Sequence, residues 1–280
     1  MTIGNGGGLE GVRALVTGAG IGIGQAIAVE LATHGAMVAV HYPPMEGAPD
    51  ETLRRVGETR GSAVAVAGDL RRAEECMRVV DEAADALLGL DVLVCNAALS
   101  YAGKFEEVAV AVLHDHLHLN VAAPFLCAQS AVRHFPVDPP GRIVIIGSFH
   151  GQRGFPGYTV YAASKAAVEG MTRALAIELA PRGIRVNVVA PGVIEVPRYF
   201  EIPGYTTEKG DSMVPLGRVG RPQDVANLVT FLVSDRASYI TGQILTTDGG
   251  SSARMGLWWP ESEQVAVQAV HAVDDQSTQR

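Results

Sequence analysis

The sequence has 280 residues, of which 48% are hydrophobic and 19% are charged, and its formal net charge is −8 at pH 7. This composition is typical of a globular protein with a sizeable core and excludes a disordered chain. The acidic balance favours neither nucleic acid nor an anionic membrane surface as a partner, and no apolar run reaches the roughly 18 residues of a membrane span.

The chain ends and the cysteines place few further constraints. Residues 1–9 are rich in glycine and lack the charged-then-apolar order of a signal peptide, so we expect a flexible leader. Residues 254–280 are expected to form a tail that is partly disordered or lies at a subunit interface, where Trp258 and Trp259 would pack. Three cysteines, without CxxC spacing, indicate neither a disulfide framework nor a zinc site and fit a cytoplasmic protein: Cys76, Cys95 and Cys127.

The chain alternates between strand and helix patterns. Short apolar runs predict seven strands, at 12–17, 37–42, 63–67, 92–95, 143–146, 184–189 and 243–246. Longer periodic stretches predict helices, at 21–34, 72–88, 110–135, 162–179 and 222–233. Continuous apolar strands that alternate with helices are typical of a parallel sheet covered on both faces. We therefore predict an α/β protein with one doubly wound, seven-stranded parallel sheet in a single domain over residues 10–253.

A glycine-rich loop joins the first predicted strand to the first helix. Glycine lets the backbone turn sharply and approach a pyrophosphate, and the helix N-terminus offers free N–H groups and the positive end of its dipole. In this position the loop predicts a dinucleotide site, whereas a tight packing turn is the alternative. The candidate cofactor-binding residues of the loop are Gly18, Gly20, Ile21, Gly22, Ile23 and Gly24.

The second predicted strand ends at His41 and Tyr42, where the adenosine ribose is expected to lie. A carboxylate there would repel the 2′-phosphate of NADP, but Tyr42 does not, so we expect a weak preference for NADP(H) over NAD(H). The nearest cations in the sequence are Arg54 and Arg55, and His41 is a weaker one. Asp69-Leu70, after the third strand, is placed to cap the adenine edge, and an acidic helix N-cap is the alternative.

Proton-transfer chemistry is indicated by Tyr161 and Lys165, which lie four residues apart at the start of a predicted helix and so share a face. An ammonium beside a phenol favours the phenolate, which predicts a lowered tyrosine pKa. Such a phenol can exchange a proton with an alcohol. Ser148, after the fifth strand, is placed to hydrogen-bond the substrate oxygen. A chance pair without a catalytic role is the alternative.

Taken together, these features resemble the short-chain dehydrogenase/reductase family across about residues 10–253. The matching positions are the loop 17–24, Asp69-Leu70, Asn120, Ser148, Tyr161, Lys165, the run 185–192 and Asp248-Gly249-Gly250. The resemblance implies a Rossmann fold and NAD(P)(H)-dependent hydride transfer between a nicotinamide and a secondary alcohol or ketone. It also implies further cofactor contacts from Asn96, Ala97, Ala98, Pro191, Gly192 and Ile194.

The same resemblance assigns roles to four residues. Tyr161 would be the general acid/base, and Lys165 would bind the nicotinamide ribose and tune Tyr161. Ser148 would orient the substrate, and Asn120 would hold a proton-relay water. Two positions depart from the family pattern: Ala98 replaces a glycine, and Val196 replaces a threonine that contacts the nicotinamide amide. Both changes are expected to weaken cofactor binding without touching the proton chemistry.

Two loops, 149–158 and 193–213, are expected to line the substrate pocket, together with the tail. His150 resembles the Ser-x-His arrangement of glucose dehydrogenases in the family and favours a polyhydroxylated substrate, whereas the aromatic second loop favours an apolar ring ketone. Both readings stay open. The candidate substrate-binding residues are Ser148, His150, Phe155, Tyr158 and Tyr199.

No metal site is expected, because His116 would point away from His114 and His118 on a helix. The expected partner is a small-molecule substrate, and the resemblance implies a homotetramer with helices 110–135 and 162–179 at a dimer interface. Two alternatives remain for the function. One is a catalytically silent cofactor-binding scaffold or sensor, and the other is dehydration, epimerisation or halide elimination on the same fold.

Overall fold

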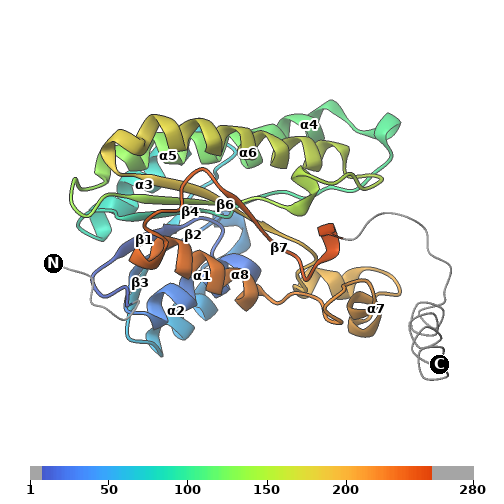
Figure 1. The fold of residues 1–280 in the computed structure, drawn as a ribbon, viewed down its shortest axis with the longest axis horizontal. Helices are drawn as coiled ribbons and strands as arrows, with labels where there is room; N and C mark the ends of the chain where they lie inside the picture. The colour runs from blue at the N-terminus through green and yellow to red at the C-terminus, as the bar shows by residue number, and fades with distance from the viewer. Residues whose placement is uncertain (1–7, 254–280) are drawn as a thin grey trace, which may run out of the picture.

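The computed structural model describes residues 8–253, and its seven strands form one parallel sheet in the order β3-β2-β1-β4-β5-β6-β7 (Figure 1). Every predicted strand is present. The strands are β1 (Arg13–Val16), β2 (Met37–Tyr42), β3 (Ser62–Ala67), β4 (Val92–Cys95), β5 (Arg142–Ile146), β6 (Arg185–Pro191) and β7 (Ile244–Thr247). The α/β class, the doubly wound Rossmann topology and the single domain are therefore confirmed.

The strand order reverses direction between β1 and β4. From β1 the chain builds outward through β2 to β3, and it then returns to pair β4 on the other side of β1. In such sheets the loops that leave the carboxyl ends of the two strands diverge and open a crevice for a ligand. The loop after β1 and the loop that begins at Asn96 border this crevice.

Helices cover both faces of the sheet, as Figure 1 shows. One layer contains α1 (Gly22–Thr33), α2 (Asp50–Gly57) and α8 (Pro222–Val233), with α1 packed on α8. The other contains α3 (Ala73–Ala86), α5 (Ala123–His134) and α6 (Thr159–Leu179). Side chains that alternate along each strand fill the two cores in turn: Ala14 and Val16 of β1 face the first layer, and Leu15 faces the second.

The prediction of one continuous helix over 110–135 is wrong, because the middle of this segment is not α-helical. The structure has α4 (Val110–Leu117), a π-helical segment (His118–Ala122) and then α5. Pro124 has no N–H, so it cannot donate to the carbonyl of Asn120 four residues earlier. The hydrogen bonding changes there from i→i+4 to i→i+5, and the Ala123 N–H donates to the carbonyl of His118, five residues earlier. The interruption places Asn120 in the widened turn, where its carbonyl has no i+4 donor because Pro124 lacks an N–H.

Three other features differ from the sequence expectations. Helix α2 was not predicted, and α7 (Thr207–Ser212) lies inside the predicted loop 193–213. Leu9, assigned to the leader, is buried in the core and donates its N–H to the His34 carbonyl at 2.7 Å, so the packed domain includes it. Trp258, Trp259 and the rest of the tail lie outside the described residues. Within residues 8–253, no helix combines the length and apolar character that crossing a bilayer requires.

Candidate active site

The glycine loop is shaped by close backbone contacts. Gly18 and Gly22 have φ values of 62° and 60°, which favour glycine. A Cβ on Gly24 would lie 2.1 Å from the Gly18 carbonyl oxygen. The amide of Asn96 donates to the carbonyls of Thr17 and Gly18, at 3.0 and 2.9 Å. The Asn96 side chain therefore holds the loop in shape.

The loop leads into the N-terminus of α1, which fits a phosphate group. Ile21 is the N-cap residue, and no side chain caps this helix end. The first N–H groups of a helix need an acceptor, and the helix dipole favours an anion there. The glycine turns and this helix end could hold the pyrophosphate of a dinucleotide, as the sequence predicts.

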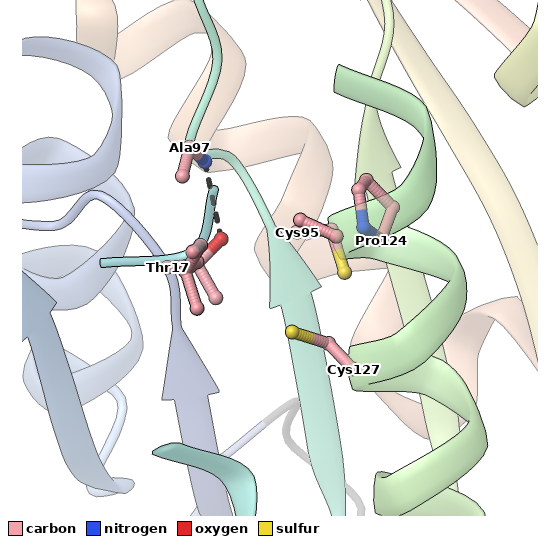
Figure 2. A pocket seen from close by; sticks show the side chains of 7 residues that line it. Thr17, Cys95, Ala97, Pro124 and Cys127 are labelled. Carbon is pink, nitrogen blue, oxygen red and sulfur yellow. Dashed lines mark hydrogen bonds between the residues drawn. The ribbon is translucent and has the colours of Figure 1, made fainter. Parts of the chain in front are cut away.

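Thr17 ties the two loops at the sheet reversal together. Its hydroxyl accepts hydrogen bonds from the backbone N–H of Asn96 at 2.9 Å and of Ala97 at 3.1 Å, the second of which Figure 2 draws. Burial raises the pKa of Cys95 to about 12, so this side chain stays a thiol and packs as an apolar group. Below Thr17 the structure leaves only a narrow gap without room for a water molecule, lined among others by Cys95, Pro124 and Cys127.

We expect Gly24→Ala to destabilise the fold and Gly20→Ala to leave it nearly unchanged. The methyl group added at position 24 would collide with a backbone oxygen, which cannot move without opening the loop. Overpacking of this kind costs about 1–3 kcal/mol. A Cβ on Gly20 would instead meet its nearest neighbours at 3.9 Å. Urea unfolding of both variants measures the difference, and equal stabilities would show that the loop tolerates a side chain at Gly24.

His41 supports the glycine loop from below. Its ring is buried, its Nδ1 accepts from the Gly18 N–H at 3.0 Å, and its Nε2 lies 3.0 Å from the Gly68 carbonyl. Burial lowers the pKa of His41 to about 4. The ring is therefore neutral at pH 7, and the prediction that His41 is a weak cation for the cofactor is wrong.

This environment makes the loop sensitive to acid. Because the native pKa of His41 lies below its ordinary value, the unfolded chain binds the proton first, and stability falls as pH drops from about 6.5 to 4. The full effect is about 3 kcal/mol. Urea unfolding at pH 7 and pH 4.5 should show a smaller loss for His41→Asn than for the native protein. The exposed-residue control His114→Asn should behave like the native protein, and identical losses in all three would contradict this role.

At the ribose end the predicted cations have other partners. Tyr42 is half-buried at the end of β2, as expected. Arg54 is bonded to Glu51 and Glu58, and Arg55 donates to Gln25 at 2.8 Å.

Asp69 does not cap the following helix, because the N-cap residue of α3 is Arg72. Its carboxylate instead accepts two bonds from the Arg71 guanidinium, at 2.8 and 2.7 Å. The N-cap alternative is therefore wrong. Leu70 is buried and packs into the second core.

Lys165 and Tyr161 lie on one face of α6, as their spacing predicts. The Lys165 ammonium is 5.6 Å from the centre of the Tyr161 ring and donates to the Ile146 carbonyl at 2.8 Å. Burial lowers the pKa of Lys165 to about 8. Among the described residues this carbonyl is its single hydrogen-bond acceptor, so two N–H groups are left for ribose hydroxyls, as the resemblance implies.

The pKa of Tyr161 is raised, so the predicted lowering is wrong for the chain alone. Burial of the phenol is the largest cause, and it outweighs the opposing effects of the nearby Ser148 hydroxyl and the Arg198 charge. The Lys165 ammonium is directed at the Ile146 carbonyl, so it does not offset the burial. Tyr161 is thus protonated at neutral pH and can act as a proton donor.

Ser148 and Asn120 are both buried beside this pair. The Ser148 hydroxyl accepts from the His150 N–H at 3.2 Å and lies near enough to Tyr161 to favour its phenolate. Both side-chain N–H groups of Asn120 are used, since they donate to the Leu99 carbonyl and to Ser164 at 3.0 Å, while its Oδ1 accepts one bond from the Leu99 N–H. A relay water could bind the second lone pair of Oδ1 or the Asn120 carbonyl, which has no i+4 donor because Pro124 lacks an N–H.

The predicted substrate residues form an aromatic cluster around Tyr161. His150 stacks on Tyr158 with ring centres 4.9 Å apart and planes 8° from parallel, and both rings lie about 6 Å from Tyr161. Phe155 packs edge-on against both His150 and Tyr158. Tyr199 contributes from the other loop, packed on Tyr205. The sequence missed the electrostatic role of Arg198, because an exposed loop cation gives no signal of the phenol that it faces.

The structure shows the burial and the contacts of four positions near the predicted cofactor site. The Ile194 side chain is buried in the first core, so only its backbone can contact a cofactor. Gly192 is required because a Cβ there would lie 2.5 Å from that of Asp248. Val196 lies beside the glycine loop, 3.5 Å from where a Gly22 Cβ would be. Ala98 is exposed and does not have a positive φ, so its backbone does not require glycine.

The histidines of α4 do not converge. His116 is buried with its Nδ1 2.8 Å from the Val112 carbonyl, whereas His114 and His118 are exposed. Within residues 8–253, no group of three or more His, Cys, Asp or Glu side chains is arranged to hold a metal ion.

Comparisons with known proteins agree with this geometry. A family model described as enoyl-(acyl carrier protein) reductase matches residues 18–252. A hydroxynaphthalene reductase-like protein of Metarhizium majus is 37% identical over 257 residues, which cover 87% of this chain and 96% of that protein. The structure of a dehydrogenase/reductase from Sinorhizobium meliloti has a TM-score of 0.81 and 38% identity, with 88% and 96% of the two chains covered. A short-chain dehydrogenase from Burkholderia cenocepacia, solved with NADP, has a TM-score of 0.80 and 37% identity over 87% and 98%. The chain belongs to the short-chain dehydrogenase/reductase family.

Proposed function

We propose that this protein is an NADP(H)-dependent ketoreductase that converts a ring ketone into a secondary alcohol. The observation that carries the proposal is the protonated Tyr161 phenol, which lies near Ser148 and is surrounded by aromatic side chains. A raised tyrosine pKa suits reduction, because the carbonyl oxygen must gain a proton as its carbon becomes an alcohol carbon. The same residues would catalyse the reverse oxidation.

The residues divide the chemistry among them. Reduced nicotinamide, bound across the glycine loop, would supply the hydride. Tyr161 donates its proton to the carbonyl oxygen, and Ser148 donates a hydrogen bond that orients the same oxygen. Lys165 holds the nicotinamide ribose with its free N–H groups, and its charge stabilises the phenolate that remains. The Asn120 carbonyl holds the water from which Tyr161 is reprotonated.

The shape of the aromatic cluster supports a planar ring substrate over a sugar. His150, Phe155 and Tyr158 offer ring faces and edges, and aromatic pairs of this kind prefer stacked or edge-on geometry. The relative named as hydroxynaphthalene reductase-like points the same way. The Nδ1 of His150 is buried without a hydrogen-bond partner among the described residues, so it can accept from a ring hydroxyl. We therefore propose a hydroxylated bicyclic ketone as the substrate class.

A substrate panel tests this function. With NADPH, the native protein should reduce 1-tetralone with a kcat/KM at least about tenfold above that for 2-octanone, because stacking contributes about 0.5–1.5 kcal/mol per aromatic contact. Tyr158→Ala removes the stacked face and should abolish this preference, and Tyr239→Ala, an exposed aromatic residue outside both loops, serves as the control. Reduction of sugars or polyols alone would contradict the ring-ketone proposal, and oxidation of NADPH by no carbonyl compound would contradict the reductase.

We also propose that the protein is a cytoplasmic homotetramer. Apolar side chains are exposed along α4, α5 and α6, which supports burial of these helices against a second copy. The residues concerned are Val110, Leu113, Leu117, Phe125 and Ile177. Light scattering at micromolar concentration should give four times the monomer mass, and a monomer would contradict the assembly.

A further inference from the structure

The adenosine end of the site contains a guanidinium that no part of the reaction uses. We propose that Arg71 binds the 2′-phosphate of NADP(H) and so sets the choice between the two nucleotides. This inference rests on the proposed function, because it presumes that a nicotinamide nucleotide occupies the crevice.

The position of Arg71 follows from two contacts. The Gly68 N–H donates to the Tyr42 carbonyl at 3.1 Å, which fixes the turn after β3 against the end of β2. From that turn the Arg71 side chain extends back over the segment after β2, where its Nη2 lies 3.8 Å from the Met45 sulfur. The guanidinium thus lies over the segment that follows Tyr42, close to where the ribose 2′ position is expected.

Arg71 also has the capacity to bind an additional anion. Its Nε and Nη2 are bonded to Asp69, but its Nη1 has no hydrogen-bond partner among residues 8–253. The Arg71 and Asp69 side chains are 40% and 31% exposed, and exposed pairs of this kind contribute only about 0–1 kcal/mol, so one bond is given up at little cost. A phosphate that carries up to two charges forms stronger, bidentate bonds with a guanidinium.

The other cations near this end are less suitable. His41 is neutral and buried beneath the loop. Arg54 is bonded to two carboxylates of its own helix, and Arg72 is bonded to Glu74. Arg55 is the competitor, since it donates to Gln25 and keeps further N–H groups free among the described residues. The negative groups that face Arg71 are Asp69 and, at longer range, Asp115.

Binding of nucleotide fragments tests the proposal without any turnover. The probes are 2′,5′-ADP and 5′-AMP, which differ by the 2′-phosphate, and calorimetry measures both dissociation constants. In Arg71→Gln we expect the affinity for 2′,5′-ADP to fall about 10- to 100-fold, the range of a charged hydrogen bond, with 5′-AMP within about threefold of native. Arg71→Lys keeps the positive charge but lacks the two parallel donors of the guanidinium, so its affinity for 2′,5′-ADP should lie between those of native protein and Arg71→Gln. Arg72→Gln removes the neighbouring charge and should leave both constants unchanged.

Each other outcome overturns the proposal. Native affinity of Arg71→Gln for 2′,5′-ADP, with an unchanged melting temperature, would show that Arg71 does not contact the phosphate. A loss confined to Arg55→Gln would move the phosphate contact to α2. An equal loss for both fragments would indicate damage to the adenosine pocket instead. If neither fragment bound the native protein, the nucleotide site itself and the proposed function would fail together.

Discussion

Replacing Tyr161 by phenylalanine should lower kcat by at least about 100-fold, while the dissociation constant for NADPH stays within a few-fold of native. Phenylalanine keeps the ring contacts with His150 and Tyr158 but cannot donate a proton, and a positioned general acid contributes about 10²–10⁴-fold in rate. Single-turnover kinetics under saturating nucleotide measures the chemical step directly.

The control for this variant is Tyr158→Phe. Tyr158 lies 6.1 Å from Tyr161 and keeps its stacking on His150 when its hydroxyl is removed. Its rate should stay within about tenfold of native. Near-native turnover by Tyr161→Phe, or an equal loss in both variants, would remove Tyr161 from the role of proton donor.

Replacing Lys165 by methionine should abolish most activity and yet stabilise the chain. The variant loses the charge that supports the Tyr161 phenolate and the N–H groups for the ribose, so kcat falls and the nucleotide dissociation constant rises. The depressed pKa of Lys165, about 8, corresponds to a burial penalty of about 3 kcal/mol at neutral pH. Methionine removes this penalty but also loses the bond to Ile146, worth about 1 kcal/mol, so the net gain is about 1–2 kcal/mol.

The gain should depend on pH in a defined direction. Below pH 8 the lysine is charged in both states, so the native protein carries the whole penalty. Between pH 8 and 10.5 the native lysine loses its proton while the unfolded chain keeps it, so the stability of the native protein rises with pH. The advantage of Lys165→Met should therefore shrink from pH 7 to pH 10 in urea unfolding. The surface control Lys104→Met should show no such trend, and a variant less stable than native at pH 7 would contradict the buried-charge account.

The sequence predicts the sheet well because buried parallel strands leave an unambiguous apolar pattern. All seven strands were located, and the glycine loop marked the reversal between β1 and β4. The π-helical segment was missed because helical periodicity does not distinguish i→i+4 from i→i+5 bonding. Pro124, four residues after Asn120, was the available signal. Helix α2 was missed because eight residues give too short a periodic pattern to count.

The sequence predicts the relative placement of Tyr161 and Lys165 better than the electrostatics around them. The spacing of Tyr161 and Lys165 correctly placed the two on one face, yet the direction of the tyrosine pKa was wrong. That direction depends on burial and on where the ammonium points, which no spacing reveals. The prediction of a charged His41 was wrong for the same reason. A histidine at a strand end looks exposed in the sequence, but here its ring is buried under the glycine loop. Arg71 was not singled out, because its proximity to Tyr42 arises from the pairing of β2 with β3.

This site is proposed to move a hydride to a ring ketone while Tyr161 supplies the proton. The most direct measurement is mass spectrometry of the alcohol formed from 1-tetralone with NADPH deuterated at C4, in separate reactions with each of the two C4 diastereomers. The account predicts one deuterium on the carbinol carbon from one diastereomer and none from the other, with the product signal lost in Tyr161→Phe. Alcohol without deuterium from both diastereomers, or equal amounts of labelled alcohol formed by native protein and Tyr161→Phe, would contradict it.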